Sequence, residues 1–384
     1  MARAFDSWRA LSLSLYMVLT GYAVLVGIPV VSAAWVGKLG FTEAQVGQLA
    51  AADLGGLSLG AVLCAWVLPK VNRRHVVLGA AALAVGANLA CMATQDFGPV
   101  LALRATAGVA SGAYTAIAVA ALGATSRPER TYAWVLFAFA LAQALELSLL
   151  PMLSMNGIYL ALALGFAGAL PFFHWMPSHA EPQPDSQAAH PALPKWVPWL
   201  VMAAVLFSYV NIGTYWTYIE LAAQDAALPS GWIRGVLIGA SAASLLGCLV
   251  STTLSRRLGL GRAIRWTLAA QAAVVLLLVG GLQTGRFLAS VSAFSALWML
   301  SDIFQLSGIA RIDASGRLAA LIPGAQGLGQ ILGPSSAAAL LGSGAGYRGV
   351  FALAAAASGV ALALHLFLHW TRAADRALAT DDLS

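Results

Sequence analysis

The sequence predicts an all-helical integral membrane protein with twelve transmembrane helices in two pseudo-symmetric six-helix bundles. The first observation is composition: 60% of the 384 residues are hydrophobic and only 9% are charged, whereas soluble domains carry about a quarter of charged residues. The second is the mean hydropathy of +0.80, which excludes a soluble protein. The third is the alternation of long apolar stretches with short polar connections.

The apolar stretches have the length that a membrane helix requires. About 20 apolar residues cross the hydrocarbon core, and every backbone group there must be paired within its own segment. The expected spans cover residues 11–36, 43–68, 75–95, 98–124, 130–153, 157–177, 197–221, 230–254, 263–283, 286–310, 317–341 and 347–370. Because most connections are very short, we expect consecutive spans to be antiparallel neighbours.

One polar segment divides the spans into two groups. The sequence PSHAEPQPDSQAAHPALPK, residues 177–195, is rich in proline and has no hydrophobic periodicity, which is typical of an extended linker. We therefore expect an N-terminal six-helix bundle over residues 1–177, a cytoplasmic linker over 178–196 and a C-terminal six-helix bundle over 197–384, ending in a short tail.

The two groups also resemble each other at an offset of 187 residues, the difference between positions 60 and 247. At this offset the pairs are Gly60 with Gly247, Lys70 with Arg257, Arg130 with Arg317, and Gln143 with Gln330. Internal repeats of this kind are typical of secondary transporters, in which the substrate site lies at the repeat interface near the bilayer midplane.

The distribution of Lys and Arg predicts the orientation of the chain. With the N-terminus in the cytoplasm, the inner side carries Arg3, Arg9, Lys70, Arg73, Arg74, Arg127, Arg130, Lys195, Arg256, Arg257, Arg262, Arg265, Arg311, Arg317, Arg372 and Arg376. The outer side carries Lys38, Arg234, Arg286 and Arg348. This asymmetry predicts two cytoplasmic termini, in a protein that we expect in the bacterial inner membrane. It also accounts for the net charge of +6, so no nucleic-acid partner is expected.

The sequence does not contain the motifs of several other classes of protein. Cys64, Cys91 and Cys248 lie inside spans without metal-ligand spacing, so we expect packing residues and neither a metal nor a cofactor. The chain has no G-x-x-x-x-G-K-[ST] loop for ATP. It also shows no pairing of a nucleophile with a base, so we do not expect an enzyme.

The loop after the second span carries a known family pattern. AWVLPKVNRR, residues 65–74, resembles the G-x-x-x-D-R-x-G-R-R loop of the major facilitator superfamily of secondary transporters. It differs where the family has Gly, Asp and Gly and this chain has Ala65, Pro69 and Asn72. In TTLSRRLGLGR, the loop of the second half, Arg256 replaces the family's acid. The resemblance implies a conformational gate formed by Lys70, Arg73, Arg74, Arg256 and Arg257.

The fourth span strengthens this resemblance. Its Arg104, Gly108 and Gly112 match the family's R-x-x-x-G-x-x-x-G segment, whose arginine is associated with proton coupling. The two glycines are also expected to bring this helix close to a neighbour. The fifth span lacks the G-x-x-x-G-P-x-x-G-G element of proton-driven exporters. A fragment of that element appears in the eleventh span as Gly329-Gln-Ile-Leu-Gly333-Pro334, which weakens the interpretation as a typical drug–proton antiporter.

Four ionisable residues lie within the spans away from their ends, and such residues usually face a protein interior or a water-filled cavity. They are Asp53, Arg104, Glu146 and Asp302, which we expect to couple transport to protons. We expect Arg104 to pair with either Asp53 or Glu146, and the acid that is left without this partner to bind a proton. The alternative is a purely structural ion pair with the second acid permanently protonated. For Asp302 the alternative is a hydrogen bond to a nearby Ser or backbone carbonyl.

The substrate site is expected to include polar residues of spans 5, 7 and 11. Asn211, Tyr215 and Tyr218 share one helix face, which suits stacking and hydrogen bonding, and Gln143 and Gln330 are related by the repeat. The alternative places Tyr218 and Trp216 in the interfacial aromatic belt, and Glu220 is expected at the surface. Packing roles are expected for Asn88, Tyr22, Tyr114, Gln305 and Gln326, and interface anchoring for His174, His365 and His369.

The sequence thus predicts a proton-coupled transporter of a small organic solute that works by alternating access, as a monomer in the lipid bilayer. An excess of intramembrane acids over Arg104 favours a cationic, zwitterionic or amphipathic substrate. One alternative is an importer of organic anions that uses Arg104. Another is a membrane sensor or lipid-handling protein with the same fold that transports no solute.

Overall fold

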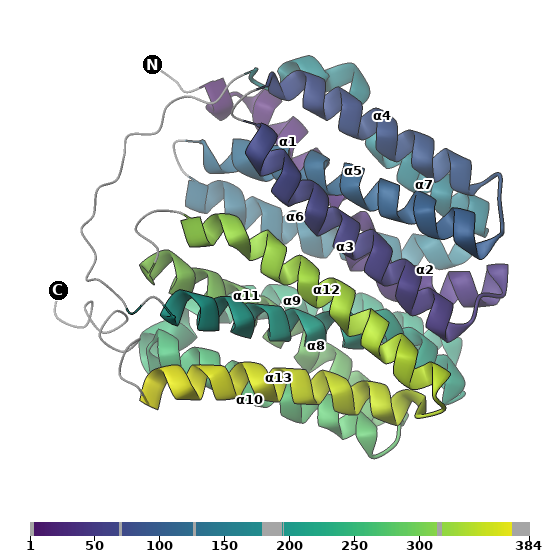
Figure 1. Ribbon diagram of the computed structural model, residues 1–384, viewed down its shortest axis with the longest axis vertical. Coiled ribbons are helices and arrows are strands. Elements are labelled where there is room, and N and C mark those ends of the chain that lie inside the picture. Colours follow the sequence, from purple (N-terminus) through teal and green to yellow (C-terminus); the bar gives the residue numbers. More distant parts are fainter. Residues whose placement is uncertain are drawn as a thin grey trace. The chain divides into compact units, whose positions relative to one another are not determined.

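The computed structural model describes residues 4–68, 71–125, 128–178, 194, 196–312 and 317–370, and these residues form helices and connecting turns without any strand. The chain divides into two compact units, unit 1 (Met1–Gln183) and unit 2 (Pro184–Ser384). Figure 1 labels the helices of both units, and each unit is described here by itself.

Within its described residues, unit 1 contains seven α-helices and three short 3₁₀ segments. They are η1 (Ala4–Asp6), α1 (Trp8–Gly21), α2 (Ala23–Leu39), α3 (Glu43–Val67), α4 (Arg73–Cys91), α5 (Phe97–Gly123), α6 (Pro128–Leu149), η2 (Leu150–Met152), α7 (Met155–Ala167) and η3 (Leu170–Trp175). Unit 2 contains α8 (Val197–Asp225), α9 (Ser230–Leu258), α10 (Leu260–Val279), α11 (Thr284–Ile312), α12 (Arg317–Gly342) and α13 (Gly346–Trp370).

Each of the twelve expected spans coincides with one helix or with two consecutive helical segments. Among the described residues, ten stretches are long and apolar enough to cross a membrane, including Trp8–Leu39, which joins α1 and α2, and Met155–Trp175, which joins α7 and η3. The other two expected spans coincide with α12 and with α6, where the apolar stretch Phe139–Met152 is shorter. The predicted all-helical membrane fold is therefore confirmed.

Helix boundaries follow local capping chemistry. Thr42 and Gln45 form a reciprocal capping box at the start of α3, with backbone-to-side-chain bonds of 3.2 and 2.9 Å. Asn72 caps α4 by accepting from the Arg74 backbone N–H at 3.0 Å. Asn72 occupies a position where the family loop has Gly, so this departure provides the start of a helix. At its C-terminus, α2 is capped by Gly40, whose φ of 72° lies in the left-handed region that favours glycine.

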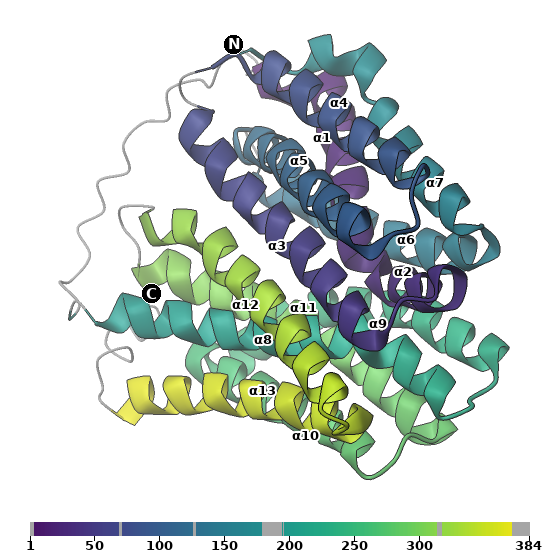
Figure 2. The same cartoon turned by 45° about the vertical axis from the view of Figure 1, so that its right-hand side comes forward.

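In unit 1, α3 and α5 touch through their backbones. A Cβ added to Gly60 would collide with the carbonyl of Val109, and one added to Gly108 would collide with the carbonyl of Asp53. Gly112 meets the carbonyl of Leu57 in the same way. These small residues let the two helices lie side by side, as the views of Figures 1 and 2 both show.

Unit 2 repeats this packing at the offset seen in the sequence. Gly247 of α9 meets the carbonyl of Ala296 in α11, and these positions correspond to Gly60 and Val109. The same correspondence relates the pairs α4–α7 and α10–α13, and the pairs α2–α6 and α8–α12. The internal repeat therefore extends from sequence to helix contacts within each unit.

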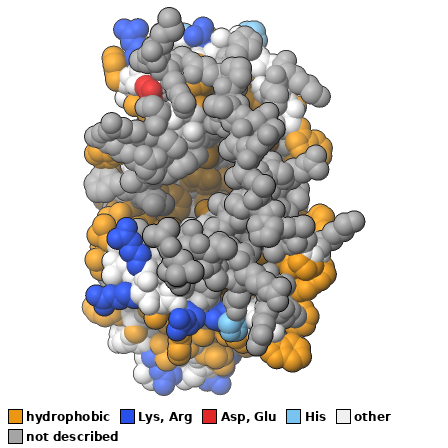
Figure 3. All heavy atoms as spheres, turned by 90° about the vertical axis from the view of Figure 1, so that its left-hand side faces the viewer, with side chains coloured by type: hydrophobic (Ala, Val, Ile, Leu, Met, Phe, Trp, Pro, Cys, Tyr) orange, Lys and Arg blue, Asp and Glu red, His pale blue; other side chains and the backbone are white. Residues whose placement is uncertain are grey.

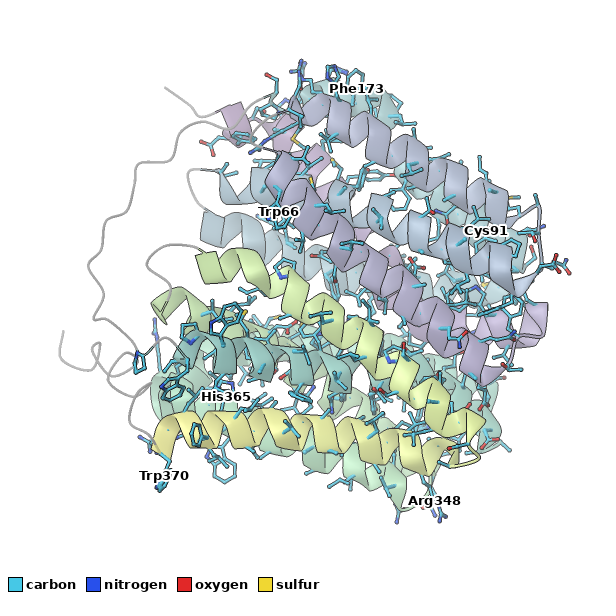
Figure 4. The ribbon with its side chains drawn as sticks, viewed as in Figure 1. Trp66, Cys91, Phe173, Arg348, His365 and Trp370 are labelled. Carbon is cyan, nitrogen blue, oxygen red and sulfur yellow. The ribbon has the colours of Figure 1, made fainter. Side chains whose placement is uncertain are left out.

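Large apolar side chains are exposed on both units. Trp66 of α3 is 70% exposed and Trp370 at the end of α13 is 82% exposed, and Figure 4 shows Trp370 and Arg348 at opposite ends of that helix. On the face drawn in Figure 3, Lys and Arg predominate among the coloured charged side chains. Such a surface suits a lipid bilayer with its headgroups.

The glycine contacts lead to a stability prediction. Gly60→Ala and Gly247→Ala should each destabilise the protein by about 1–3 kcal/mol, because the added methyl group collides with a backbone carbonyl. Gly79→Ala and Gly239→Ala are matched controls, since nothing lies within 4 Å of either added Cβ. The controls should be neutral or stabilising, by up to about 1 kcal/mol. Thermal unfolding in detergent measures all four, and equal effects of the two pairs would contradict the close contact.

Candidate functional site

Arg104 is the centre of a buried polar cluster in unit 1. It lies on α5, is 1% exposed, and donates from Nε to Asp53 Oδ2 of α3 at 2.8 Å. A second donor of the guanidinium forms a salt bridge with the same oxygen. Its Nη1 donates to Asn88 Oδ1 of α4 at 2.7 Å, and the Asn88 amide group donates to the Ala84 carbonyl at 2.8 Å. A buried ion pair is tolerated when its donors and acceptors are satisfied in this way.

Two aromatic residues complete the cluster. The guanidinium carbon of Arg104 lies 5.9 Å from the ring centroid of Tyr159 on α7. The Tyr159 hydroxyl accepts from Trp35 Nε1 of α2 at 3.1 Å. The cluster therefore joins α2, α3, α4, α5 and α7. Sequence reasoning missed Tyr159 and Trp35, because nothing in their spacing separates them from ordinary core aromatics, and it assigned Asn88 a packing role.

Glu146 of α6 stands apart from this cluster. Its Oε2 is buried and has no hydrogen-bond partner, and the ion pair formed within the described residues joins Arg104 to Asp53 only. The carboxylate lies against Gly27 of α2, where an added Cβ would be 2.8 Å from Oε2. In unit 2 the larger and the smaller residue of this contact are exchanged between the two helices. Thr214 corresponds to Gly27, and Gly333 corresponds to Glu146. An added Cβ on Gly333 would lie 3.0 Å from Thr214 Oγ1.

Asp302 of α11 belongs to a second cluster, in unit 2. Its Oδ2 accepts from the Tyr209 hydroxyl of α8 at 3.1 Å and from Trp298 Nε1, one turn earlier on α11, at 3.0 Å. Gln326 of α12 donates to the Tyr209 hydroxyl at 2.9 Å. Asp302 is half-buried. Its donors are thus a phenol and an indole rather than the Ser or backbone group considered from the sequence. Trp298 has a sequence signal, since it precedes Asp302 by four residues.

The three polar residues that share one face of α8 are buried and packed within unit 2. Asn211 donates from Nδ2 to the Ala354 carbonyl of α13 at 2.6 Å. Tyr215 stacks on Phe294 with 3.8 Å between ring centroids, and its hydroxyl lies 2.9 Å from Ser290 Oγ. Tyr218 is 0% exposed. A role for these residues in substrate binding stays a prediction.

Glu220 was expected at the surface, and this expectation was wrong. The residue is only 8% exposed, its Oε1 accepts from Gln224 at 3.2 Å, and its Oε2 is buried without a partner. The reason is that α8 packs against α9, α11, α12 and α13, and its residues from Ser208 to Ala223 are all buried. Trp216 is covered as well, with 1% exposure, and its ring packs against Trp298 with 6.1 Å between centroids.

The repeat-related amides are alike in their surroundings. Gln143 is 1% exposed and Gln330 is 3% exposed, and each has a buried Oε1 without a hydrogen-bond partner. Gln330 lies beside Gly213 of α8, where an added Cβ would be 2.8 Å from Gln330 Oε1. Orphaned amide oxygens of this kind are suited to bind a donor group, and substrate binding by the two amides stays a prediction.

The basic residues expected at the gate differ in their surroundings. Arg74 donates from Nε to the Met176 carbonyl at 2.7 Å, and the Arg73 backbone N–H donates to the Ser178 carbonyl at 3.0 Å. The Arg73 guanidinium lies 5.1 Å from the Phe5 ring centroid. Arg256 and Arg257 are exposed in the last turn of α9. Lys70 lies outside the described residues, and the gate itself stays a prediction.

The weaker candidates are mostly packed. Tyr22 contacts Phe139 edge-on, Tyr114 is buried, and Gln305 donates to Ser208 and Ser301. His174 and His369 are exposed, whereas His365 has a buried Nε2. Figure 4 labels His365 on α13, near the end of the helix that carries Trp370.

The buried ion pair predicts a non-additive effect on stability. Arg104→Gln alone should cost about 3–5 kcal/mol, because it leaves the Asp53 carboxylate buried without its counter-charge. Adding Asp53→Asn should recover most of this loss, since the double variant buries no charge at this position. Thermal unfolding of the single and double variants in detergent gives the coupling, and additive losses would argue against the pair.

The comparisons with known proteins agree with this architecture. The model of the Major Facilitator Superfamily matches residues 12–310. A crystal structure of a mutant of the nucleoside transporter NupG is similar over 93% of this chain and 99% of that chain, with a TM-score of 0.72 and 14% sequence identity. No curated protein matches the chain. The family match covers most of the chain, and such proteins move small molecules across membranes without acting as enzymes, so this integral membrane protein belongs to the major facilitator superfamily of transporters.

Proposed function

We propose that this transporter couples the movement of a small organic solute to protons by alternating access, with Glu146 as the proton carrier. The observation that carries the proposal is the buried Oε2 of Glu146, which has no hydrogen-bond partner. An ionised carboxylate without a partner is very costly to bury, and binding a proton removes that cost. The charge of the Glu146 carboxyl group therefore depends on whether it has bound or released a proton.

The surroundings of the other acids favour Glu146 over them. Asp53 is already neutralised by Arg104, so a change in its protonation would break a satisfied ion pair. Oδ2 of Asp302 accepts two hydrogen bonds, which stabilise an ionised carboxylate. Glu146 has neither a cationic partner nor a donor to Oε2. In this scheme Asp53 and Arg104 hold unit 1 together.

The same geometry supports a cationic, zwitterionic or amphipathic substrate. Arg104 is 1% exposed, donates to Asp53 and Asn88, and lies near the Tyr159 ring, which disfavours the alternative of an anion held by Arg104. Asp302 is half-buried and retains capacity to attract a positive group. We therefore assign Asp302 to the substrate's cationic group and Tyr209 and Gln326 to its neighbouring polar atoms.

Neutral solutes and lipids form the remaining candidates. The similar fold of a nucleoside transporter makes nucleosides a reasonable neutral class to include in any test. A lipid-handling protein or a sensor with this fold would show no solute flux. The asymmetric distribution of Lys and Arg along the sequence supports a cytoplasmic placement of both termini, and we propose a monomer in a bacterial inner membrane.

The first functional prediction concerns Glu146. In proteoliposomes, Glu146→Gln should abolish solute-driven proton movement, because the amide cannot release a proton, while solute exchange and folding persist. Solute and proton fluxes are measured together over a panel of organic cations, zwitterions, anions and nucleosides. Glu43→Gln, at the first position of α3, is the matched control and should transport like the wild type. Unchanged proton coupling in Glu146→Gln would refute the assignment.

The second concerns Asp302. Asp302→Asn should raise the KM for a cationic substrate about tenfold to a hundredfold, as expected for losing a charged interaction of about 1.5–3 kcal/mol. It should leave the KM for a neutral substrate nearly unchanged. Asp225→Asn is the control, because Asp225 is an exposed acid at the end of α8. Equal effects on both substrate classes would show that Asp302 only supports packing.

A further inference from the structure

A cluster of arginine and aromatic side chains lies at the end of unit 1 where α1 begins and η3 ends. The guanidinium carbon of Arg9 lies 5.7 Å from the Trp8 ring centroid and 6.0 Å from that of Trp175. The two indole rings meet edge-on, with 5.2 Å between centroids. Phe172 extends this aromatic surface, with 4.6 Å between its ring centroid and that of Trp175. Figure 4 labels the neighbouring residue Phe173 at this end of the unit.

Two further arginines, from the first turn of α4, reach the same end. Arg74 donates from Nε to the carbonyl of Met176, the residue that follows η3, at 2.7 Å. Arg73 is only 5% exposed, lies with its guanidinium carbon 5.1 Å from the Phe5 ring centroid, and has no hydrogen-bond partner for Nε and Nη1. Arg9 is exposed. Within the described residues, none of these three arginines takes part in a salt bridge.

The charge at this end is strongly positive. The segments that form it, residues 4–9, 71–76 and 170–178, contain three arginines and two histidines but a single acid, Asp6. The family loop has an acid at the position of Pro69, which this chain lacks. A buried guanidinium without a counter-charge is costly, and an anion nearby lowers that cost. The excess of arginines therefore indicates an anionic partner.

The internal repeat shows that helix packing does not require the cluster. At the offset of 187 residues, Arg73 corresponds to Leu260 and Trp175 corresponds to Leu362. Leu260 is 7% exposed and belongs to the hydrophobic core of unit 2, against which Leu362 packs. Unit 2 thus fills the equivalent positions with apolar side chains. The arginines and the indole rings of unit 1 therefore serve a purpose other than filling space.

Exposed apolar surface beside the arginines indicates the chemistry of that partner. Trp8 is 64% exposed and Phe172 is 42% exposed. Aromatic and cationic side chains that lie together are typical of the zone between acyl chains and headgroups. A guanidinium binds phosphate oxygens through paired hydrogen bonds, whereas the rings pack against acyl chains. A soluble anion would leave both rings in water, and a phospholipid uses the arginines and the rings together.

We propose that this cluster is a binding site for one anionic phospholipid. Its phosphate accepts hydrogen bonds from Arg9 and Arg74, which reach adjacent residues at the end of η3, and its acyl chains lie against Trp8 and Phe172. Arg73 behind them adds to the attraction of the negative headgroup. Binding at this site requires neither a solute nor a proton, so the proposal goes beyond the function proposed above and does not depend on it.

The test measures lipid binding to the whole protein in detergent. Native mass spectrometry gives the dissociation constants for added phosphatidylglycerol and for added phosphatidylcholine, which is zwitterionic. Arg9→Gln should weaken the binding of phosphatidylglycerol about fivefold to tenfold, as expected for losing an arginine contact with a phosphate near the membrane surface. It should leave the binding of phosphatidylcholine nearly unchanged. Arg348→Gln, which removes an exposed arginine of α13, is the matched control and should bind both lipids like the wild type.

A competition experiment separates a lipid from a soluble anion. Glycerol 3-phosphate carries the phosphate without acyl chains, so it should compete at least about a hundredfold more weakly than phosphatidylglycerol. Thermal unfolding checks that each variant is folded. Equal affinity of the wild type for the two lipids, or wild-type affinity for phosphatidylglycerol in the double variant Arg9→Gln with Arg74→Gln, would overturn the proposal. Equally strong competition by glycerol 3-phosphate would overturn it as well, because the occupant would then be a soluble anion.

Discussion

The backbone contact between α3 and α5 is the constraint on which the rest of unit 1 depends. Gly108 brings α5 against the carbonyl of Asp53 itself, and Arg104 lies one turn earlier on the same helix. The ion pair is therefore a consequence of two helices that approach closely at the residue that carries the carboxylate. Side chains with a Cβ at Gly60 or Gly108 would separate the helices and withdraw the counter-charge from Asp53.

The cluster built on this contact reaches most of the unit. Asn88 brings in α4, and the Tyr159 ring with its bond to Trp35 brings in α7 and α2. None of the cluster's side-chain polar atoms is among the buried atoms of the described residues that have no hydrogen-bond partner, so the charges are buried without an orphan at its centre. Glu146 differs because its buried Oε2 has no hydrogen-bond partner, and that contrast within one unit separates a structural pair from a candidate carrier.

The repeat gives the two units the same helix contacts but different chemistry on them. Where unit 1 has Gly27 facing a carboxylate, unit 2 has Thr214 facing Gly333. The larger side chain lies on one helix of the pair in unit 1 and on the other helix in unit 2, and both pairs stay closely packed. Close-packed interiors tolerate such substitutions when the total side-chain volume is kept. The polar groups can therefore differ between the units, and only unit 2 has at this level the donors Tyr209 and Trp298 around an acid, Asp302, among the described residues.

The sequence by itself determined the medium, the helical spans, the internal repeat and the short set of ionisable residues inside the spans, because these depend on composition, length and spacing. Asp53, Arg104 and Glu146 were all identified in this way. Only the tertiary structure decided that Asp53 pairs with Arg104, that Tyr209 and Trp298 hold Asp302, and that Glu220 is buried. The physical reason is that spacing gives the direction of a side chain around its own helix, whereas its partner depends on which helix packs against that face.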